Sequence, residues 1–260
     1  MIMKIGEIKY ANVYPIFYYL KKIDDYDFVR GTPSFLNKMI REGGVDIGVC
    51  SSIEYARNPG KYVIIPDISI SSVGDVKSVC LFSNKKIENL ENATIFLTEE
   101  SGTSVVLLKI LLKNYFNVNV SFTNDFDNND AALLIGDKAL FSYYNNDYKY
   151  VYDLGFHWFQ FSGYPFVFAL WIADSKWEGT EDIKLLHKNL VNIKVNSQKN
   201  LAALLEEYSL KGLTSYQILD YWNIIDYNLT EKHICGLIKF YKLAREIGEI
   251  KKFPPLNLSV

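Results

Sequence analysis

Short apolar segments alternate with helical patterns along the first two thirds of the chain, and this alternation restricts the fold more than any other feature. Apolar runs of strand length, each bounded by polar residues or glycine, occur at 45–50, 78–83, 131–135 and 166–173. Segments with helical periodicity lie between them, and from Glu181 onward the pattern is almost wholly helical, in about four segments with breaks expected at 196–197, 211–212 and 229–230. Strands that alternate with helices are typical of α/β proteins. We therefore predict an α/β fold with a helical C-terminal segment.

The order of the predicted strands indicates that a middle unit is inserted into the first one. We expect the chain to enter this unit after 81–83 and to leave it through 168–172, so that two crossing strands connect two lobes. The predicted division is 1–82 plus 173–260 for the first lobe and 83–172 for the second. A ligand-binding cleft is expected between them.

Charge and cysteine content argue against several classes of function. The 260 residues carry a formal net charge of -2, so the basic face of a nucleic-acid-binding protein is not expected. Charged residues interrupt every apolar run before it reaches the roughly 20 residues of a membrane span. The start of the chain lacks the pattern of an export signal, and the three cysteines have no C-x-x-C spacing. We expect a cytoplasmic protein with unpaired thiols.

Motifs for metals and nucleotides are absent from the sequence. The three histidines, His157, His187 and His233, lie far apart and show no metal-ligand spacing. Neither the P-loop pattern nor G-x-G-x-x-G occurs. We expect neither a metal nor a cofactor.

Polar residues follow several predicted strands at their carboxyl ends. They are Asn12 after the first strand, Ser51 and Ser52 after 45–50, Ser101, Gly102, Thr103 and Ser104 after 93–97, and Asp137 after 131–135. In open α/β sheets ligands bind outside these strand ends, beside helix N-termini whose free N–H groups favour anions. Gly102 would let a ligand approach the backbone. Ser, Thr, Asn and Asp are also the ordinary helix N-caps, so the pattern alone leaves both capping and binding of a carboxylate or phosphate open.

A set of short segments is jointly similar to one known family. KYANVYP resembles its Y-x-N-x-x-P pattern, and GVDIGVCSSIEYARNP resembles its G-x-D-I-G-x-x-S-x-I-E-Y segment. Further matches, in family order, are PDISISSVGDVKSVCLFS, TSVVLLK, AALLIGDKAL, YDLGFHW and GYPFVFALW. The matches span about residues 5–173, and the helical C-terminal third is similar only in kind. The family is that of chorismate dehydratase in the futalosine route to menaquinone.

The resemblance implies a periplasmic-binding-protein-like type II fold, with two α/β lobes and the ligand in the cleft. It implies cofactor-free elimination of water from chorismate, which gives 3-[(1-carboxyvinyl)oxy]benzoate. Matched residue by residue, the family's active-site Asn falls on Asn12 and its active-site Ser on Ser78, which begins a strand and has no capping duty. No matched residue is an obvious general base, and the enolpyruvyl carboxylate of the substrate is the candidate. Glu99 and Glu100 are a departure, since two acids precede an expected anion site.

Two other functions fit the same fold. The sister enzyme that makes 1,4-dihydroxy-6-naphthoate is expected to begin with an S-P-C-P-N-D-T-F-like stretch, which this chain lacks. A non-catalytic cytoplasmic binding protein for a small carboxylate would use the same cleft without chemistry.

Overall fold

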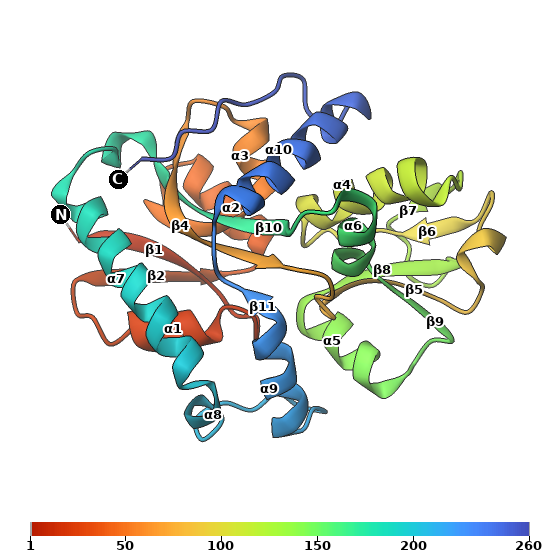
Figure 1. The fold of residues 1–260 in the computed structure, drawn as a ribbon, viewed down its shortest axis with the longest axis horizontal. Coiled ribbons are helices and arrows are strands. Elements are labelled where there is room, and N and C mark those ends of the chain that lie inside the picture. Colours follow the sequence, from red (N-terminus) through yellow and green to blue (C-terminus); the bar gives the residue numbers. More distant parts are fainter. Residues whose placement is uncertain (1, 260) are drawn as a thin grey trace.

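The computed structural model describes residues 2–259, which form two lobes around two β-sheets (Figure 1). The first sheet has the order β11-β4-β10-β3-β1-β2. Its strands are β1 (Met3–Ile8), β2 (Tyr26–Gly31), β3 (Ile47–Ser51), β4 (Tyr62–Ser72), β10 (Phe166–Asp174) and β11 (Ile225–Asp226). The second sheet has the order β7-β6-β8-β5-β9. Its strands are β5 (Val79–Ser83), β6 (Thr94–Phe96), β7 (Ser121–Thr123), β8 (Ala131–Ile135) and β9 (Tyr150–Asp153). The predicted α/β class is confirmed.

Helices cover both sheets. The first lobe carries α1 (Tyr14–Leu20), α2 (Pro33–Arg41) and α3 (Ser52–Arg57), and the second carries α4 (Gly102–Leu111), α5 (Gly136–Asn145) and α6 (Leu154–Ser162). Four helices follow β10, namely α7 (Glu181–Lys199), α8 (Leu201–Leu204), α9 (Ser215–Ile224) and α10 (Glu231–Glu246). The break predicted at 196–197 is wrong, because α7 continues to Lys199, whereas the breaks at 211–212 and 229–230 fall between helices.

The apolar runs of the sequence are strands that are covered on both faces. β3 and β5 are buried along their whole length. In the second sheet, Leu81 and Leu133 belong to the main core with α4, while Phe82 and Leu134 belong to a smaller cluster under α5. Burial on both faces requires continuous apolar sequence, which explains why these strands were visible in it.

The segments that connect the lobes lie next to the predicted ones. β5 pairs along its length with β8 and β9 of the second sheet, and β10 pairs with β3 and β4 of the first. The chain therefore crosses at 73–78, between β4 and β5, and returns at 163–165, between α6 and β10. The predicted crossing strands and the divisions at 82/83 and 172/173 are wrong by several residues. A strand buried in one sheet and a strand shared by two lobes have the same apolar pattern, so the sequence did not distinguish them.

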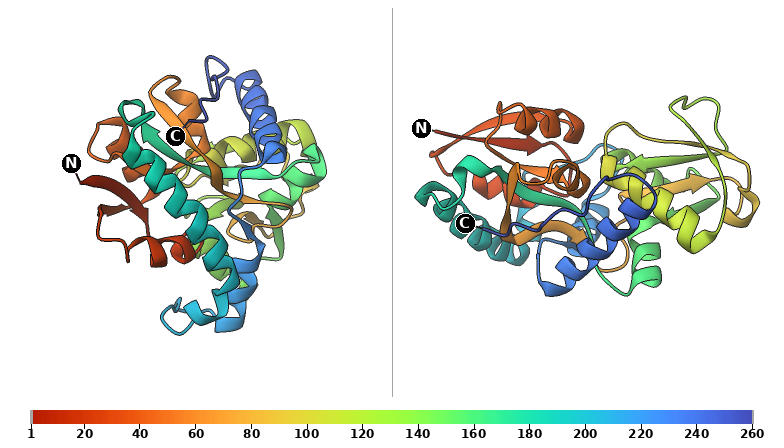
Figure 2. Two further views of the ribbon diagram at one scale, coloured as in Figure 1. Left: turned by 60° about the vertical axis from the view of Figure 1, so that its left-hand side comes forward. Right: turned by 90° about the horizontal axis from the view of Figure 1, so that it is seen from above.

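The last helix lies over the junction of the lobes. Figure 2, seen from above, places α10 there, and α10 packs against β10 and α3 of the first lobe and α4 of the second. At Gly236 of α10 an added Cβ would lie 2.2 Å from the backbone oxygen of Pro165, in the return segment. The chain then runs back to the first lobe, where Ile64 N–H donates to the oxygen of Asn257 (2.8 Å).

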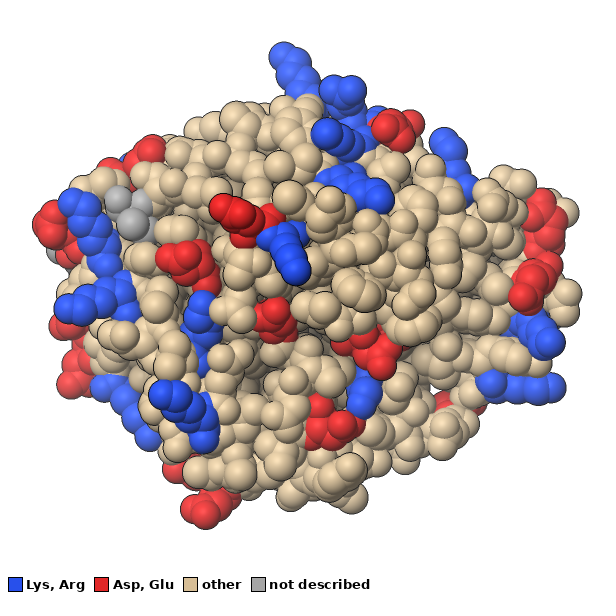
Figure 3. Space-filling model, in the orientation of Figure 1, with Lys and Arg blue, Asp and Glu red and all other residues tan. Residues whose placement is uncertain are grey.

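Charged side chains are interspersed on the face seen in Figure 3, with Lys and Arg among Asp and Glu. Within residues 2–259, no helix is both long enough and apolar enough to cross a membrane.

Candidate active site between the lobes

A small cavity lies between the two lobes. The first lobe lines it with Tyr10, Asn12, Ser51 and Phe168, among others, and the second with Ser78, Ser101, Ser104, Ile135 and Gly136. Its volume is about 70 Å³, whereas ligand sites usually measure about 300–1,000 Å³. The two lobes are thus close together, and the space between them admits only a few water molecules. A ring-sized ligand requires the lobes to part.

Asn12 lines this cavity with an unsatisfied side chain. Its Oδ1 is buried and has no hydrogen-bond partner within the described chain. The backbone oxygen of Asn12 accepts from the hydroxyl of Tyr227 (2.8 Å), and the N-cap of α1 is Val13, not Asn12. A buried polar atom without a partner costs about 1–3 kcal/mol. Asn12 is therefore no helix cap, and its amide is available to a ligand.

Ser78 lies at the end of the crossing segment, directly before β5. Its side chain is 2% exposed, and its Oγ accepts from the hydroxyl of Tyr221 (2.8 Å). Its backbone oxygen accepts from Gly136 N–H (2.8 Å), which ties the start of α5 to the crossing segment. The structure thus brings together the two residues that the resemblance marked as catalytic.

Three of the predicted binding serines also line the cavity. Ser51 accepts from Asn37 Nδ2 (2.9 Å), a buried contact that no sequence motif indicated. Ser101 is the N-cap of α4 and accepts from Ser104 N–H, while the two hydroxyls lie 3.0 Å apart. Ser101 therefore both caps its helix and faces the cavity.

Ser52, Gly102 and Thr103 join the lobes instead of lining the cavity. Ser52 Oγ donates to the oxygen of Val167 within the first lobe (2.9 Å) and lies 3.4 Å from Thr103 Oγ1 of the second lobe. Thr103 Oγ1 also accepts from Ile53 N–H of the first lobe (3.1 Å). A Cβ on Gly102 would lie 3.1 Å from Ile53. The expectation that Thr103 faces the cleft is wrong, because its hydroxyl is used where the start of α4 packs on α3.

Asp137 also connects the lobes. Its Oδ1 accepts from Ala11 N–H (3.0 Å), and burial, with Glu100 nearby, raises its pKa. It lines a larger neighbouring groove and not the cavity. A carboxylate facing an anionic ligand would repel it, so the geometry favours closure of the lobes over substrate contact as the role of Asp137.

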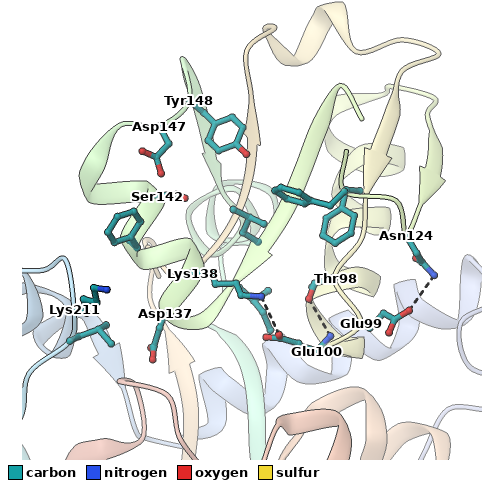
Figure 4. A pocket seen from close by; sticks show the side chains of 16 residues that line it. Thr98, Glu99, Glu100, Asn124, Asp137, Lys138, Ser142, Asp147, Tyr148 and Lys211 are labelled. Atoms are coloured by element: carbon teal, nitrogen blue, oxygen red, sulfur yellow. Dashed lines mark hydrogen bonds and ion pairs between the residues drawn. The ribbon is translucent and has the colours of Figure 1, made fainter. Parts of the chain in front are cut away.

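The two unexpected acids, Glu99 and Glu100, belong to the larger groove and not to the cavity. This groove has a volume of about 1260 Å³, and Glu99 and Glu100 are among the residues that line it (Figure 4). Glu100 accepts from the hydroxyl of Tyr10 (2.5 Å) across the lobes and lies 3.7 Å from Lys138 Nζ. The ring of Tyr10 packs on Gly136, where an added Cβ would lie 3.0 Å from it. Burial and Glu100 raise the pKa of Tyr10, so its hydroxyl remains a donor.

Helix N-termini give the cavity its electrostatic character. Its lining includes Val13 and Ser101, the N-caps of α1 and α4, Pro33, the first residue of α2, and Ile135, the N-cap of α5. Among residues 2–259, no Lys, Arg, Asp, Glu or His lines the cavity. The N-terminal ends of helices carry partial positive charge and unpaired N–H groups. The cavity therefore favours an anion without supplying a cationic side chain.

Among residues 2–259 no group of three His, Cys, Asp or Glu side chains is arranged to hold a metal ion. The polar side chains that line the cavity carry hydroxyls and one amide. They can bind and orient carboxylates and hydroxyls.

Comparison with known proteins gives consistent matches. Residues 3–246 match the model of a family described as menaquinone biosynthesis. A protein named chorismate dehydratase from Thermus thermophilus is 32% identical over 187 residues, which are 64% of this chain and 68% of that protein. Another, from Campylobacter jejuni, is 28% identical over 254 residues, which are 95% of this chain and 99% of that protein.

Solved structures support the fold. A crystal structure of a protein from Archaeoglobus fulgidus has a TM-score of 0.78 at 20% identity and covers 95% of this chain and 98% of its own. The periplasmic aliphatic sulphonate binding protein of Escherichia coli has a TM-score of 0.63 at 13% identity, with 97% and 89% covered. The predicted two-lobed, periplasmic-binding-protein-like fold is confirmed.

Proposed function

This chain belongs to the chorismate dehydratase family of menaquinone biosynthesis, and from that premise we propose that it eliminates water from chorismate to give 3-[(1-carboxyvinyl)oxy]benzoate. One observation carries the proposal to this molecule. The unpartnered Oδ1 of Asn12 and the buried hydroxyl of Ser78 line one cavity, into which four helix N-termini of both lobes lead. Chorismate is a dianion with a ring hydroxyl, and this cavity offers what such a molecule needs.

The elimination breaks two bonds and forms one. The C–H bond at ring carbon 3 and the C–O bond at ring carbon 4 break, a double bond forms between these carbons, and the proton and hydroxide leave as water. The proton at carbon 3 is acidic because the negative charge that its removal leaves on the ring can spread into the conjugated carboxylate. Helix N-termini at that carboxylate stabilise the transition state more than the ground state. Formation of the aromatic ring supplies the driving force.

Each cavity residue then has a specific role. Asn12 accepts from the ring hydroxyl or donates to a carboxylate, and Ser78 donates a hydrogen bond to the departing hydroxyl. Ser51, Ser101 and Ser104 donate to the carboxylates. No Asp, Glu or His of the described chain lines the cavity, so the enolpyruvyl carboxylate of the substrate acts as the base. The step needs no cofactor, and the product enters the futalosine route in the cytoplasm.

Incubation of the pure protein with chorismate, followed by proton NMR, tests this function. We expect the ring-diene signals to be replaced by aromatic ones while the enolpyruvyl methylene signals remain. A binding protein would shift or broaden the chorismate signals without consuming it. The sister naphthoate-forming enzyme would also leave chorismate unchanged, and either result would contradict the proposal.

A further inference from the structure

Three buried donors from the C-terminal segment contact the residues around the cavity. Tyr221 of α9 donates to Ser78 Oγ, Trp222 Nε1 donates to the oxygen of Ala11, and Tyr227 donates to the oxygen of Asn12, each at 2.8 Å. This segment lies outside the part of the chain that resembled the family in its motifs. We propose that Tyr221 is a positioning residue for water elimination, which holds Ser78 so that the serine proton points to the departing hydroxyl. The proposal rests on the function proposed above.

The direction of the hydrogen bond follows from the two groups. A phenol is a stronger acid than an aliphatic alcohol, so Tyr221 donates and Ser78 accepts. Burial raises the pKa of Tyr221 well above its usual range, so its hydroxyl keeps its proton. With one lone pair of Ser78 Oγ occupied by Tyr221, the hydroxyl proton of Ser78 has to point elsewhere.

The hydroxyl proton of Ser78 is free to point into the cavity. Within the described chain, Ser78 Oγ makes no other hydrogen bond than the one with Tyr221, and Ser78 is part of the cavity lining. Without Tyr221, the Ser78 hydroxyl could rotate and would lose its fixed direction. With it, the proton is already aimed when the substrate enters, which is the pre-organisation that lowers a barrier.

The element that carries Tyr221 is itself held firmly. A capping box of Thr214 and Gln217 fixes the start of α9. The next element, β11, pairs with β4 through Ile225 and Ser72, immediately before the crossing segment. Tyr221 is therefore attached to the first lobe, while Ser78 leads into the second.

Tyr221→Phe tests the proposal, with Tyr241→Phe as its matched control. Tyr241 is also a fully buried tyrosine of the C-terminal helices, and it donates one hydrogen bond, to the oxygen of Ser52 (2.6 Å), which is not a cavity residue. Both variants lose one buried hydrogen bond, so we expect comparable drops in melting temperature. Only Tyr221→Phe should lower kcat for chorismate, by about tenfold, with KM within about twofold of wild type.

The Ser78→Ala background separates positioning from a general structural effect. If Tyr221 acts through Ser78, Tyr221→Phe causes no further loss of kcat in that background. A loss as large as in wild type, or no loss in wild type, would overturn the proposal. A wild-type protein that leaves chorismate unchanged would instead overturn the proposed function itself, and this role with it.

Discussion

Asn12 and Ser78 differ in what their side chains do in the closed structure. Asn12 keeps a buried oxygen without a partner among residues 2–259, whereas Ser78 already receives a hydrogen bond from Tyr221. Substitution of the first should therefore affect mainly ligand binding. Substitution of the second should affect both turnover and stability.

Asn12→Asp should abolish chorismate binding while the protein stays folded. The change places a negative charge beside a carboxylate of the substrate, and Asn12 caps no helix, since the N-cap of α1 is Val13. Asn12→Ala is the control, and it should retain weak binding because it adds no charge. Calorimetric titration and thermal melting measure both effects. Wild-type affinity in Asn12→Asp would remove Asn12 from the site.

Ser78→Ala should lower kcat more than it weakens substrate binding, because its hydrogen bond is made mainly in the transition state. From the sequence no loss of stability is expected, because Ser78 begins a strand and has no capping duty. In the structure the substitution leaves the buried hydroxyl of Tyr221 without its acceptor, which costs about 1–3 kcal/mol. Combined denaturation and kinetic measurements check this. Unchanged kcat would contradict the catalytic role, and unchanged stability would contradict the hydrogen bond.

Residue patterns could predict part of this site. Asn12 and Ser51 follow apolar strands, and Ser101 opens a helix, so their place at the strand ends was visible in the sequence. The sequence did not indicate the roles of Tyr221, Tyr227 and Asn37. Each of these residues contacts the site from a distant position in the chain and belongs to no motif. Thr103 and Asp137 have the same residue types as ligand-binding positions but are used between the lobes.

At the level of elements, strands with continuous apolar sequence were predicted, whereas strands that are short or that mix polar with apolar residues were missed. β9 contains three partly exposed residues, and β11 has only two residues, so neither shows a clear apolar run. α6 follows β9 directly and was missed with it. The division into lobes was displaced because β5 and β10 resemble crossing strands.

Asp153 links two of these elements and gives the protein a pH dependence. It caps α6 and accepts from the N–H groups of Val76 and Lys77 in the crossing segment. Burial raises the pKa of Asp153 to about 6 from an ordinary value of 3.8. The folded state therefore binds the proton of the Asp153 carboxyl more tightly than the unfolded state does. As the pH rises through the range between these two pKa values, ionisation of Asp153 lowers the free energy of unfolding.

Asp153→Asn removes that ionisation. Relative to wild type, its free energy of unfolding should rise by up to about 3 kcal/mol between about pH 4 and about pH 7. Urea denaturation of both proteins at these pH values measures the difference, in which other titrating groups cancel. A constant difference, or one that falls with pH, would contradict the raised pKa.

For the whole molecule, closure of the lobes depends on a few contacts around the cavity. Tyr10 and Glu100, and Ala11 and Asp137, form hydrogen bonds from one lobe to the other. The cavity of about 70 Å³ that they enclose has no room for chorismate, so the substrate enters only after the lobes part. These contacts are made only when the lobes meet, so they stabilise the ligand-free closed form and oppose substrate binding.

Tyr10→Phe should strengthen chorismate binding by up to roughly fivefold, since about 1 kcal/mol of hydrogen bonding is lost from the closed form, which excludes the substrate. Tyr18→Phe is the control, because Tyr18 also donates to a glutamate, Glu207, but within the first lobe (2.5 Å). Titration with chorismate compares the two variants. Equal affinities for Tyr10→Phe and wild type would contradict the closing role.

Elimination of water from chorismate is the central claim, and the fate of the ring hydroxyl oxygen tests it most directly. Chorismate with an isotopic oxygen label on that hydroxyl is incubated with the wild-type protein, and the product is analysed by mass spectrometry. We predict a product lighter than chorismate by one labelled water, with the enolpyruvyl group retained and no label left. Label retained in the product, with the enolpyruvyl group lost as pyruvate, or unreacted chorismate, would contradict the account.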